Sequence, residues 1–462
     1  MSQLAKPLIA IAAVITLAVC VHADTLANCT YEDIRGTWVF ELGPSYKEGS
    51  GENCSPTSEI AVQYKVKVHL DYPDLAVDEF GNQGFWTIIY NQGFEVVVGG
   101  SKYFGFSEFK SKTVSICDKV KPGWAHDVLG HDRRCFQGQK QSPAIKLNKR
   151  ISYASSLRYE QFISSEDMVT RINKAQKSWT ATTYPQFDAL SRDDFVRMTG
   201  GKRSQMLSRP KPAPITEEQE KLRQSLPSSF DWRKVNGQNF VSPVRNQGAC
   251  GSCYAFASMA MAESRLRILT NNTQKHVFAP QDIVECSPYS QGCEGGFPYL
   301  IGGKYGEDFG FVEEKCNLYK GTDAKCSTEK SCARNYVTDY KYVGGYYGAC
   351  NEVAMMEAIY NRGPVAIGFM VYNDFTRYQS GVYHHVFDSE NHPFEPFELT
   401  NHAVLVVGWG EVTSPSYERY WIVKNSWGET WGMDGYFWIR RGNDECGMES
   451  MAVESTPIVR FD

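Results

Sequence analysis

Residues 247–256 read Gln-Gly-Ala-Cys-Gly-Ser-Cys-Tyr-Ala-Phe, and this stretch decides how the rest of the chain is interpreted. The residues from Ser252 to Leu269 include few helix breakers and carry apolar side chains on one face, which predicts a helix with Cys253 at its start. Backbone N–H groups and the helix dipole at that end favour a thiolate over a thiol. A thiolate can attack a peptide carbonyl, and the Gln247 amide and the Cys253 backbone N–H could stabilise the resulting oxyanion. We therefore expect Cys253 to be a catalytic nucleophile.

His402 and Asn425 are the candidates for the base that such a nucleophile requires and for the group that orients this base. His402 opens an apolar, strand-like run, which would fix its ring beside a cleft. Asn425 follows another such run, where its amide could orient the imidazole while Trp427 shields that hydrogen bond from water. The alternative fate of Cys253 is a disulfide, the usual one in a secreted chain, but Cys250 is the better candidate for that.

The chain before this region has a β pattern between Thr37 and Cys135. Residues 62–70 alternate strictly between apolar and polar side chains, which is the period of a strand. Asn91-Gln92-Gly93 and Gly99-Gly100 mark turns between further β-rich runs. We expect an all-β barrel or sandwich here.

Residues 143–225 connect the two regions, and they are polar and free of cysteine. Helical stretches are predicted at 166–175 and 191–198. The segment ends in Arg209-Pro210-Lys211-Pro212-Ala213-Pro214, whose prolines favour an extended, exposed linker. Such a connector is accessible to proteases, so it is either a removable pro-segment or a permanent linker.

The composition is typical of a secreted globular protein. With 42% hydrophobic and 22% charged residues, the chain is not mainly disordered, collagenous or coiled-coil. Its net charge of -5, without a long basic run, excludes nucleic acid as an expected partner. Lys6, an apolar run and Val21-His22-Ala23 predict a signal peptide over residues 1–23. The alternative is a membrane anchor, for which the run is too short, and no second run could span a membrane.

Cysteines and glycosylation motifs also indicate the secretory pathway. Of the 14 cysteines, Cys20 lies in the signal peptide, so an odd number remains and at least one thiol has no internal partner. Asn28, Asn53 and Asn271 are candidate glycosylation sites. The pair His384-His385 lacks a cysteine or carboxylate at ligand spacing, so we expect no metal site.

These motifs resemble those of the papain-like cysteine peptidases. That family carries Cys-Gly-Ser/Ala-Cys-Trp/Tyr with a His and an Asn about 130–150 residues downstream, and His402 and Asn425 follow Cys253 in this order. Asp231-Trp232-Arg233, residues 243–247 and residues 292–296 match further motifs of the family. The resemblance implies an α+β fold in which residues 226–462 form a two-lobed catalytic domain, with a helical lobe and a β-barrel lobe.

The resemblance narrows to the dipeptidyl peptidase I branch of the family and then covers essentially the whole mature chain. Tyr254 follows the nucleophile, as in that branch, where most of the family has Trp. Residues 24–30 and 177–184 resemble the mature start and the pro-segment of the branch.

This narrower resemblance implies the domain organisation. Residues 24–142 would form a β-barrel exclusion domain that blocks the cleft beyond the second substrate residue. Residues 143–225 would be removed as a pro-segment, and the catalytic domain would be nicked near 391–392 into heavy and light chains.

The resemblance also implies further site residues. Asp24, the first mature residue, would hold the α-ammonium of the substrate, and Met448 would line the floor of the pocket for the second substrate residue. Near that pocket the family binds a chloride ion, and the residues that match its ligands are Phe297, Tyr299 and Tyr342. No metal or organic cofactor is expected.

The cysteine framework of the family implies five disulfide bonds in this chain. They are Cys29–Cys117, Cys54–Cys135, Cys250–Cys293, Cys286–Cys326 and Cys316–Cys332. Cys253, Cys350 and Cys446 remain, so the nucleophile accounts for the odd thiol and the other two are expected to be buried and inert.

The sequence therefore predicts a lysosomal or secreted thiol exopeptidase that removes dipeptides from free N-termini through a thioester on Cys253. Family analogy adds a homotetramer and activation by other proteases. One alternative is an endopeptidase of the same fold whose N-terminal domain is only an accessory module. Another is a catalytically silent binding protein, against which the presence of Cys253, His402, Asn425 and Gln247 argues.

Overall fold

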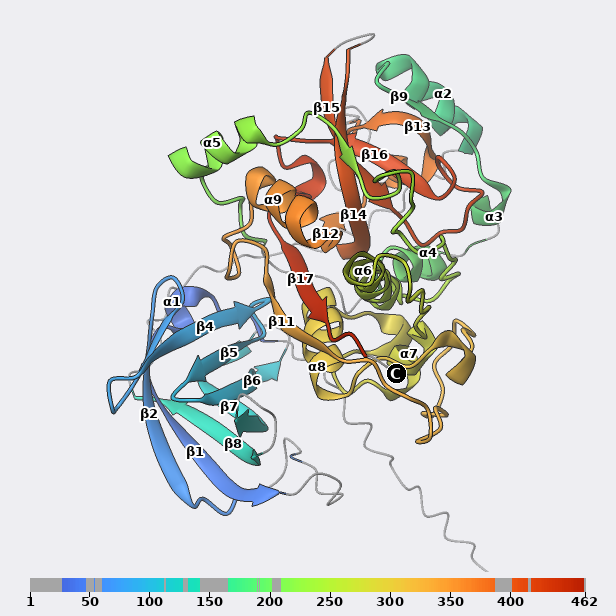
Figure 1. Ribbon diagram of the computed structural model, residues 1–462. Coiled ribbons are helices and arrows are strands. Elements are labelled where there is room, and N and C mark those ends of the chain that lie inside the picture. The colour runs from blue at the N-terminus through green and yellow to red at the C-terminus, as the bar shows by residue number, and fades with distance from the viewer. Residues whose placement is uncertain are drawn as a thin grey trace, which may run out of the picture.

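The computed structural model describes residues 27–46, 54, 60–111, 114–127, 132–141, 165–188, 190, 192–201, 209–386, 401–413 and 417–460. The expected signal peptide, Asp24, Asn53 and the expected nick near 391–392 lie outside these ranges. Within the described ranges, no helix is long and apolar enough to cross a membrane. An N-terminal barrel lies beside a larger body of helices and sheet (Figure 1).

The barrel consists of eight antiparallel strands that close on themselves. Strand β2 has the alternation predicted from the sequence, with Val68 and Leu70 fully buried and Lys67 and His69 exposed. Five rings in mutual contact pack inside the barrel: Trp38, Phe40, Phe94, Tyr103 and Phe136. After the short helix α1 (Tyr31–Ile34), the strands are β1 (Gly36–Tyr46), β2 (Tyr64–Asp71), β3 (Leu75–Asp78), β4 (Gln83–Ile89), β5 (Gly93–Val98), β6 (Ser101–Ser111), β7 (Val114–Asp127) and β8 (Arg133–Lys140).

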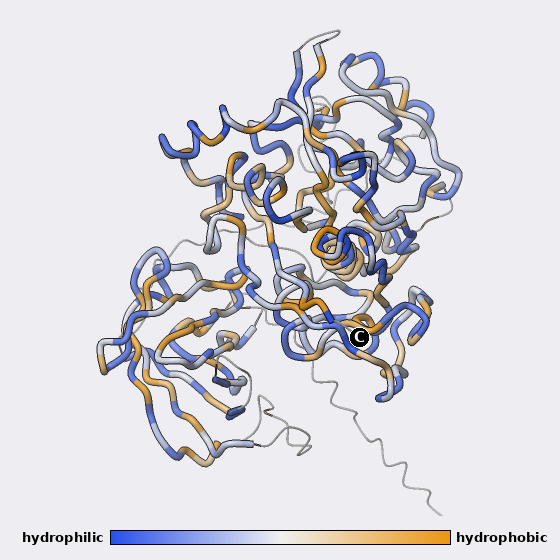
Figure 2. The backbone as a smooth tube through the Cα atoms, in the orientation of Figure 1, coloured by the Kyte–Doolittle hydropathy of each residue, from blue (hydrophilic) through white to orange (hydrophobic). Residues whose placement is uncertain are grey.

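The larger body is built around helix α6 (Cys253–Leu269), which is buried from Cys253 to Arg267. Hydrophobic segments concentrate along α6 and the neighbouring strands, whereas α5 at the rim is hydrophilic (Figure 2). The expectation of a single apolar face is wrong for α6, which is buried all round because it packs on the sheet as well as on α7 and η2. The helical lobe comprises α6, α7 (Pro280–Cys286), η1 (Gly292–Glu294), η2 (Tyr299–Tyr305), α8 (Gly306–Asp308) and η3 (Glu314–Cys316).

The second lobe is a sheet with the strand order β11-β17-β12-β14-β15-β16-β13-β9, to which β10 adds beside β14. The predicted apolar runs at 403–407 and 420–423 lie in β14 and β15. Together with the barrel, the two lobes confirm the predicted fold class. The elements are β10 (Phe230–Asp231), β11 (Val337–Tyr342), α9 (Glu352–Arg362), β12 (Val365–Met370), η4 (Asn373–Arg377), β13 (Tyr378–Tyr383), β14 (Asn401–Val412), β15 (Glu418–Lys424), β16 (Tyr436–Arg440), η5 (Glu445–Gly447) and β17 (Ala452–Pro457).

The connecting segment, residues 143–225, lies on the catalytic body where it is described. Its strand β9 adds antiparallel to the edge strand β13, with Trp179 opposite Gly381. Its other elements are α2 (Ser165–Ala175), α3 (Pro185–Asp188), α4 (Arg192–Met198) and α5 (Glu217–Ser225). Both helices predicted from the sequence form, as α2 and α4.

The expectation of an exposed linker at 209–214 is wrong for its first residue. The Arg209 guanidinium donates hydrogen bonds to the backbone oxygens of Gly368, at 2.5 Å, and Gly447, at 2.8 Å. The Ala213 backbone N–H donates to the Cys350 oxygen at 2.8 Å. The prolines of this segment predicted an extended backbone. They gave no sign that backbone oxygens of the catalytic body accept hydrogen bonds from Arg209.

Buried charges join the barrel to the larger body. The Glu95 carboxylate of β5 accepts hydrogen bonds from the hydroxyls of Tyr340, at 2.8 Å, and Tyr299, at 3.3 Å. Lys102 of β6 lies 3.4 Å from Glu95 and donates to Glu307 at 2.9 Å. Because Glu95 is only 3% exposed, its charge depends on these partners for stabilisation.

We predict that Glu95→Ala lowers the free energy of unfolding by about 2–4 kcal/mol, since it leaves two buried hydroxyls without their acceptor. Urea denaturation checks the value. The control is Glu32→Ala, whose carboxylate is 65% exposed in a surface pair with Arg35, and which should cost less than about 0.5 kcal/mol. Equal effects of the two substitutions would contradict a role of Glu95 in docking the barrel.

Candidate active site

Cys253 is the first residue of α6, as the sequence predicts, and its side chain is fully buried. The preceding residue, Ser252, makes no side-chain capping bond to the helix. The Ala403 backbone N–H of β14 lies 3.4 Å from the Cys253 sulfur and donates to it. The packing of α6 on β14 therefore brings the thiol beside the strand that carries His402.

The imidazole of His402 is oriented by Asn425 at the end of β15. Its Nε2 lies 2.8 Å from the Asn425 side-chain oxygen. An amide oxygen only accepts, so Nε2 carries the proton and Nδ1 keeps its lone pair. Among the described residues, Nδ1 has no hydrogen-bond partner. Trp427 stacks on the imidazole with centroids 4.9 Å apart and is 2% exposed, so it covers this hydrogen bond as expected.

Gln247 is fixed by several hydrogen bonds near the start of α6. Its side-chain oxygen accepts from the Ser426 hydroxyl at 2.6 Å, which directs the amide nitrogen the other way. That nitrogen donates to the Cys250 oxygen at 2.8 Å and to the Met198 oxygen at 3.1 Å. The Met198 oxygen also lies 3.4 Å from the Trp427 indole nitrogen, which donates to it. The backbone oxygen of Met198, the last residue of α4, thus accepts a hydrogen bond from the Gln247 side-chain amide. The sequence had assigned this amide to the oxyanion.

The connecting segment therefore contacts Gln247 and Trp427 beside the catalytic pair, and burial opposes the expected thiolate in this state. Burial raises the pKa of the Cys253 thiol to about 12, although backbone N–H groups, including that of Ala403, oppose the shift. Burial lowers the pKa of His402 to about 4, against a smaller opposing effect of the Asn425 hydrogen bond. The helix N-terminus favours a thiolate, but loss of water outweighs it here. Cys253 and His402 are both neutral under the cover.

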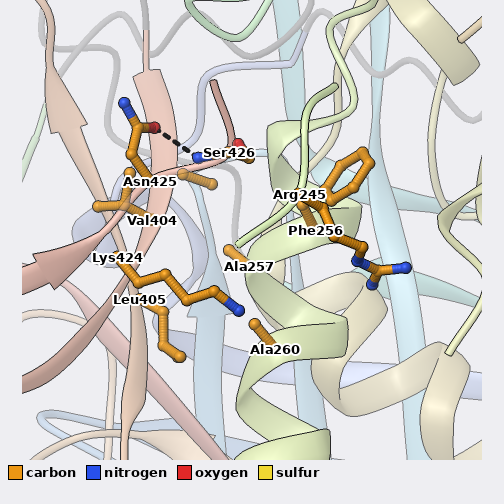
Figure 3. A pocket seen from close by; sticks show the side chains of 10 residues that line it. Arg245, Phe256, Ala257, Ala260, Val404, Leu405, Lys424, Asn425 and Ser426 are labelled. Carbon is orange, nitrogen blue, oxygen red and sulfur yellow. Dashed lines mark hydrogen bonds between the residues drawn. The ribbon is translucent and has the colours of Figure 1, made fainter. Parts of the chain in front are cut away.

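A small cavity lies beneath the site, between α6 and strands β14 and β15 (Figure 3). The Lys424 side chain, next to Asn425 in the chain, points from β15 toward Ala257 and Ala260 of α6. Its ammonium donates to the Ser242 hydroxyl at 3.1 Å, and burial lowers its pKa to about 7. Lys424 packs between the lobes and makes no contact with the catalytic thiol or imidazole among its described hydrogen bonds.

The three predicted chloride-binding residues come together at the contact with the barrel. Tyr299 and Tyr342 stack with centroids 4.3 Å apart, and Tyr90 of the barrel stacks on Phe297 at 4.2 Å. The Tyr299 backbone N–H lies 3.3 Å from the Tyr90 hydroxyl and donates to it. The buried Tyr342 hydroxyl has no hydrogen-bond partner among the described residues. The Tyr299 N–H already has its acceptor in Tyr90, so the Tyr342 hydroxyl is the neutral donor of this cluster that is left for an anion.

The other predicted residues fall in different places. Met448 is fully buried directly after η5, and Gly447 beside it accepts the hydrogen bond from Arg209. Asn271 is exposed in the turn after α6, whereas Asn28 is half-buried and its side-chain oxygen accepts from Asn91 at 3.2 Å.

The structure contains five disulfide bonds in the pairing that the family framework implied. They are Cys29–Cys117, Cys54–Cys135, Cys250–Cys293, Cys286–Cys326 and Cys316–Cys332. Cys253, Cys350 and Cys446 are free thiols, and all three are buried.

Two histidine clusters bear on the expectation of no metal. His384 lies 2.8 Å from the Ser178 hydroxyl of the connecting segment, and His385 pairs with Asp374, so both contact protein groups. His126 lies near Glu307 and Asp308 at the barrel contact. There the Lys304 ammonium lies 3.1 Å from His126 and 3.0 Å from Asp308, so a protein cation already occupies the position that a metal would take.

Residues that the sequence analysis missed are Met198, Arg209 and Tyr90. Each acts through a contact between segments far apart in the chain, so no local pattern marks it. The sequence offered one indirect signal. Residues 177–184 resembled a pro-segment, and the pro-segment of a peptidase covers the cleft of the enzyme.

Comparisons with known proteins agree with this geometry. Residues 226–456 match the model of the papain family cysteine proteases, and residues 24–140 match that of the cathepsin C exclusion domain. Cathepsin C from Schistosoma mansoni is 44% identical over 446 residues, which are 95% of this chain and 96% of that protein. This chain belongs to the cathepsin C group of papain-family cysteine peptidases. It is thus a cysteine peptidase of the dipeptidyl peptidase I family, as predicted.

More distant relatives share the catalytic region. Pro-cathepsin H from Bos taurus is 38% identical over 235 residues, 50% of this chain and 65% of that protein. Among solved structures, procathepsin B S9 from Trypanosoma congolense superposes with a TM-score of 0.52 at 28% identity, over 64% of this chain and 99% of that chain. Procathepsin L2 from Tenebrio molitor gives a TM-score of 0.51 at 30% identity, over 63% of this chain and 88% of that chain.

Because burial lowers the pKa of His402, the free energy of unfolding depends on pH in the acidic range. The covered imidazole stays neutral down to about pH 4, whereas a free one binds a proton near pH 6.5. Between these values the unfolded chain binds more protons, so the stabilisation present above pH 6.5 is lost as the pH falls toward 4. We expect urea denaturation to show a loss of up to about 3 kcal/mol over this range, in the difference between wild type and His402→Gln. Parallel pH profiles of the two proteins would contradict this assignment.

Proposed function

We propose that this peptidase removes dipeptides from the free N-termini of peptides and proteins. The observation that carries the proposal is the position of Tyr90. It projects from the barrel into the ring cluster formed by Phe297, Tyr299 and Tyr342, and it lies near enough to Arg209 to interact with it electrostatically. We propose that a barrel fixed there closes one end of the substrate path and leaves room for two residues before the scissile bond, as the resemblance to the dipeptidyl peptidase I branch implies.

The chemistry follows from the groups around Cys253. His402 takes the thiol proton at Nδ1, and the thiolate attacks the carbonyl of the second peptide bond. The Gln247 side-chain N–H and the Cys253 backbone N–H bind the oxyanion. His402 then protonates the leaving amine, and water releases the dipeptide from the thioester, with Asn425 orienting the imidazole throughout.

Asp24 is proposed to hold the α-ammonium of the substrate. It lies outside the described residues, but the chain that follows it is anchored near the cluster, since the Cys29 backbone N–H donates to the Asn91 oxygen at 2.7 Å. Asn91 is next to Tyr90, and five extended residues span about 17 Å, which brings Asp24 within reach of Tyr90. Removal of residues 1–23 would expose Asp24 as the N-terminus. A desolvated carboxylate would discriminate against a blocked amine.

The connecting segment is proposed to be an inhibitory pro-segment. The Met198 oxygen accepts the hydrogen bond of the Gln247 amide, and Arg209 binds beside Met448. Substrate therefore cannot enter until residues 143–225 are removed. An activating protease would remove them and cut near 391–392. Family analogy supports a homotetramer in the lysosome or outside the cell, with glycans at Asn28, Asn53 and Asn271 as a further proposal.

Chloride is proposed as a bound cofactor near the pocket for the second residue. Burial raises the pKa of Tyr342 well above its usual range, so its hydroxyl stays a donor. The Tyr299 hydroxyl donates to Glu95 and its backbone N–H donates to the Tyr90 hydroxyl, so a chloride ion would compete with Tyr90 for that N–H. Met448 would line the floor of that pocket.

The test compares one fluorogenic dipeptide amide with and without an N-terminal blocking group, hydrolysed by the processed protein at mildly acidic pH with chloride. We expect cleavage of the free-amine substrate alone, with kcat/KM lower by at least about 100-fold for the blocked one, because an ion pair to the α-ammonium is lost. Cys253→Ser should abolish turnover of both. Equal cleavage of the two substrates would favour an endopeptidase.

A further inference from the structure

Tyr319 lies behind the two donors of the proposed oxyanion site, on the loop that follows η3. Its hydroxyl is 2.7 Å from the backbone oxygen of Gln247 and 2.6 Å from the side-chain oxygen of Ser252. Gln247 carries the side-chain donor, and Ser252 directly precedes the backbone donor, Cys253. A single hydroxyl thus joins the two chain segments from which the donors come.

The directions of these hydrogen bonds are fixed by chemistry. A backbone oxygen only accepts, so the Tyr319 hydroxyl donates to Gln247 and accepts from Ser252. Burial raises the pKa of Tyr319 well above its usual range, so the phenol keeps the proton that this arrangement requires.

Ser252 serves this bridge instead of capping its own helix. It occupies the N-cap position of α6, where a serine side chain commonly accepts from the backbone N–H groups of the first turn. Its hydroxyl makes no such bond and faces Tyr319. The chain thus forgoes a stabilising cap at the position where Cys253 begins the helix.

Tyr319 is itself held rigidly. Its backbone N–H donates to the Glu314 carboxylate at 2.9 Å, and its ring packs edge-on against Phe256 of α6 with centroids 4.8 Å apart. The disulfides Cys316–Cys332 and Cys286–Cys326 flank the loop on both sides. Hydrogen-bond donors that must be held in place within a fraction of an ångström need such a rigid support.

We propose that Tyr319 is a positioning residue for the oxyanion site, which fixes the separation of the Gln247 and Cys253 donors without touching substrate. The inference rests on the proposed function, because only acyl transfer at Cys253 makes that separation matter. The second support of Gln247, the Ser426 hydroxyl on its side-chain oxygen, orients the amide but does not tie it to α6. Tyr319 is therefore a link between the two donors that acts in addition to the bond from the Gln247 amide to the Cys250 oxygen.

The test is Tyr319→Phe in the processed protein, which keeps the ring and removes the hydroxyl. We expect kcat for a free-amine dipeptide amide to fall about tenfold with KM unchanged, since misplaced donors weaken binding of the transition state only. The rate of Cys253 alkylation by iodoacetamide, which needs a thiolate but no oxyanion, should change less than about twofold. Ser252→Ala, which removes the other end of the bridge, should shift kcat in the same direction.

The matched control is Tyr305→Phe, which also removes a buried hydroxyl, one that donates to Asp282 at 2.8 Å. It should lower the thermal midpoint about as much as Tyr319→Phe but leave kcat unchanged. Alkylation that falls in parallel with hydrolysis, or unchanged kcat in Tyr319→Phe, would overturn the positioning role. A wild type that alkylates at Cys253 yet hydrolyses neither free nor blocked substrates would overturn the proposed function and this inference together. A wild type that cleaves both would overturn only the exopeptidase assignment.

Discussion

The packing of helix α6 against strand β14 is the contact on which the site depends. The helix is buried along nearly its whole length, so its position is fixed by neighbours on several sides rather than by its own propensity. That position places the Cys253 sulfur 3.4 Å from the Ala403 N–H and beside His402. A substitution that shifts α6 against β14 therefore changes the distance between the nucleophile and its base.

Burial has two opposite consequences in this protein. It gives the catalytic groups a rigid, water-poor setting in which donors act strongly on a developing charge. The same burial favours the neutral thiol and the neutral imidazole. One physical effect thus supports catalysis in the open site and suppresses it in the covered one. Departure of the segment would change which of these prevails, with no rearrangement of Cys253 or His402.

The sequence predicted the parts of the fold that have local signals. Strand β2 shows the period-two alternation of apolar and polar residues, and α6 is a run with few helix breakers. Cys253 and Gln247 belong to one short motif. The disulfide pairing came from resemblance, because spacing alone leaves many connectivities open. Burial opposes the expected thiolate, and the sequence shows the helix N-terminus but not how completely the folded chain buries Cys253. Met198, Arg209, Tyr90 and Tyr319 act across long chain separations and left no pattern to find.

The central claim is that Cys253 works on the second peptide bond from a free N-terminus. The most direct measurement is a mass-spectrometric time course of one unmodified peptide of about ten residues, digested by the processed protein. The account predicts a ladder of products that shortens by two residues at a time from the N-terminus, with free dipeptides appearing in sequence order. Internal fragments, or a ladder with single-residue steps, would contradict it.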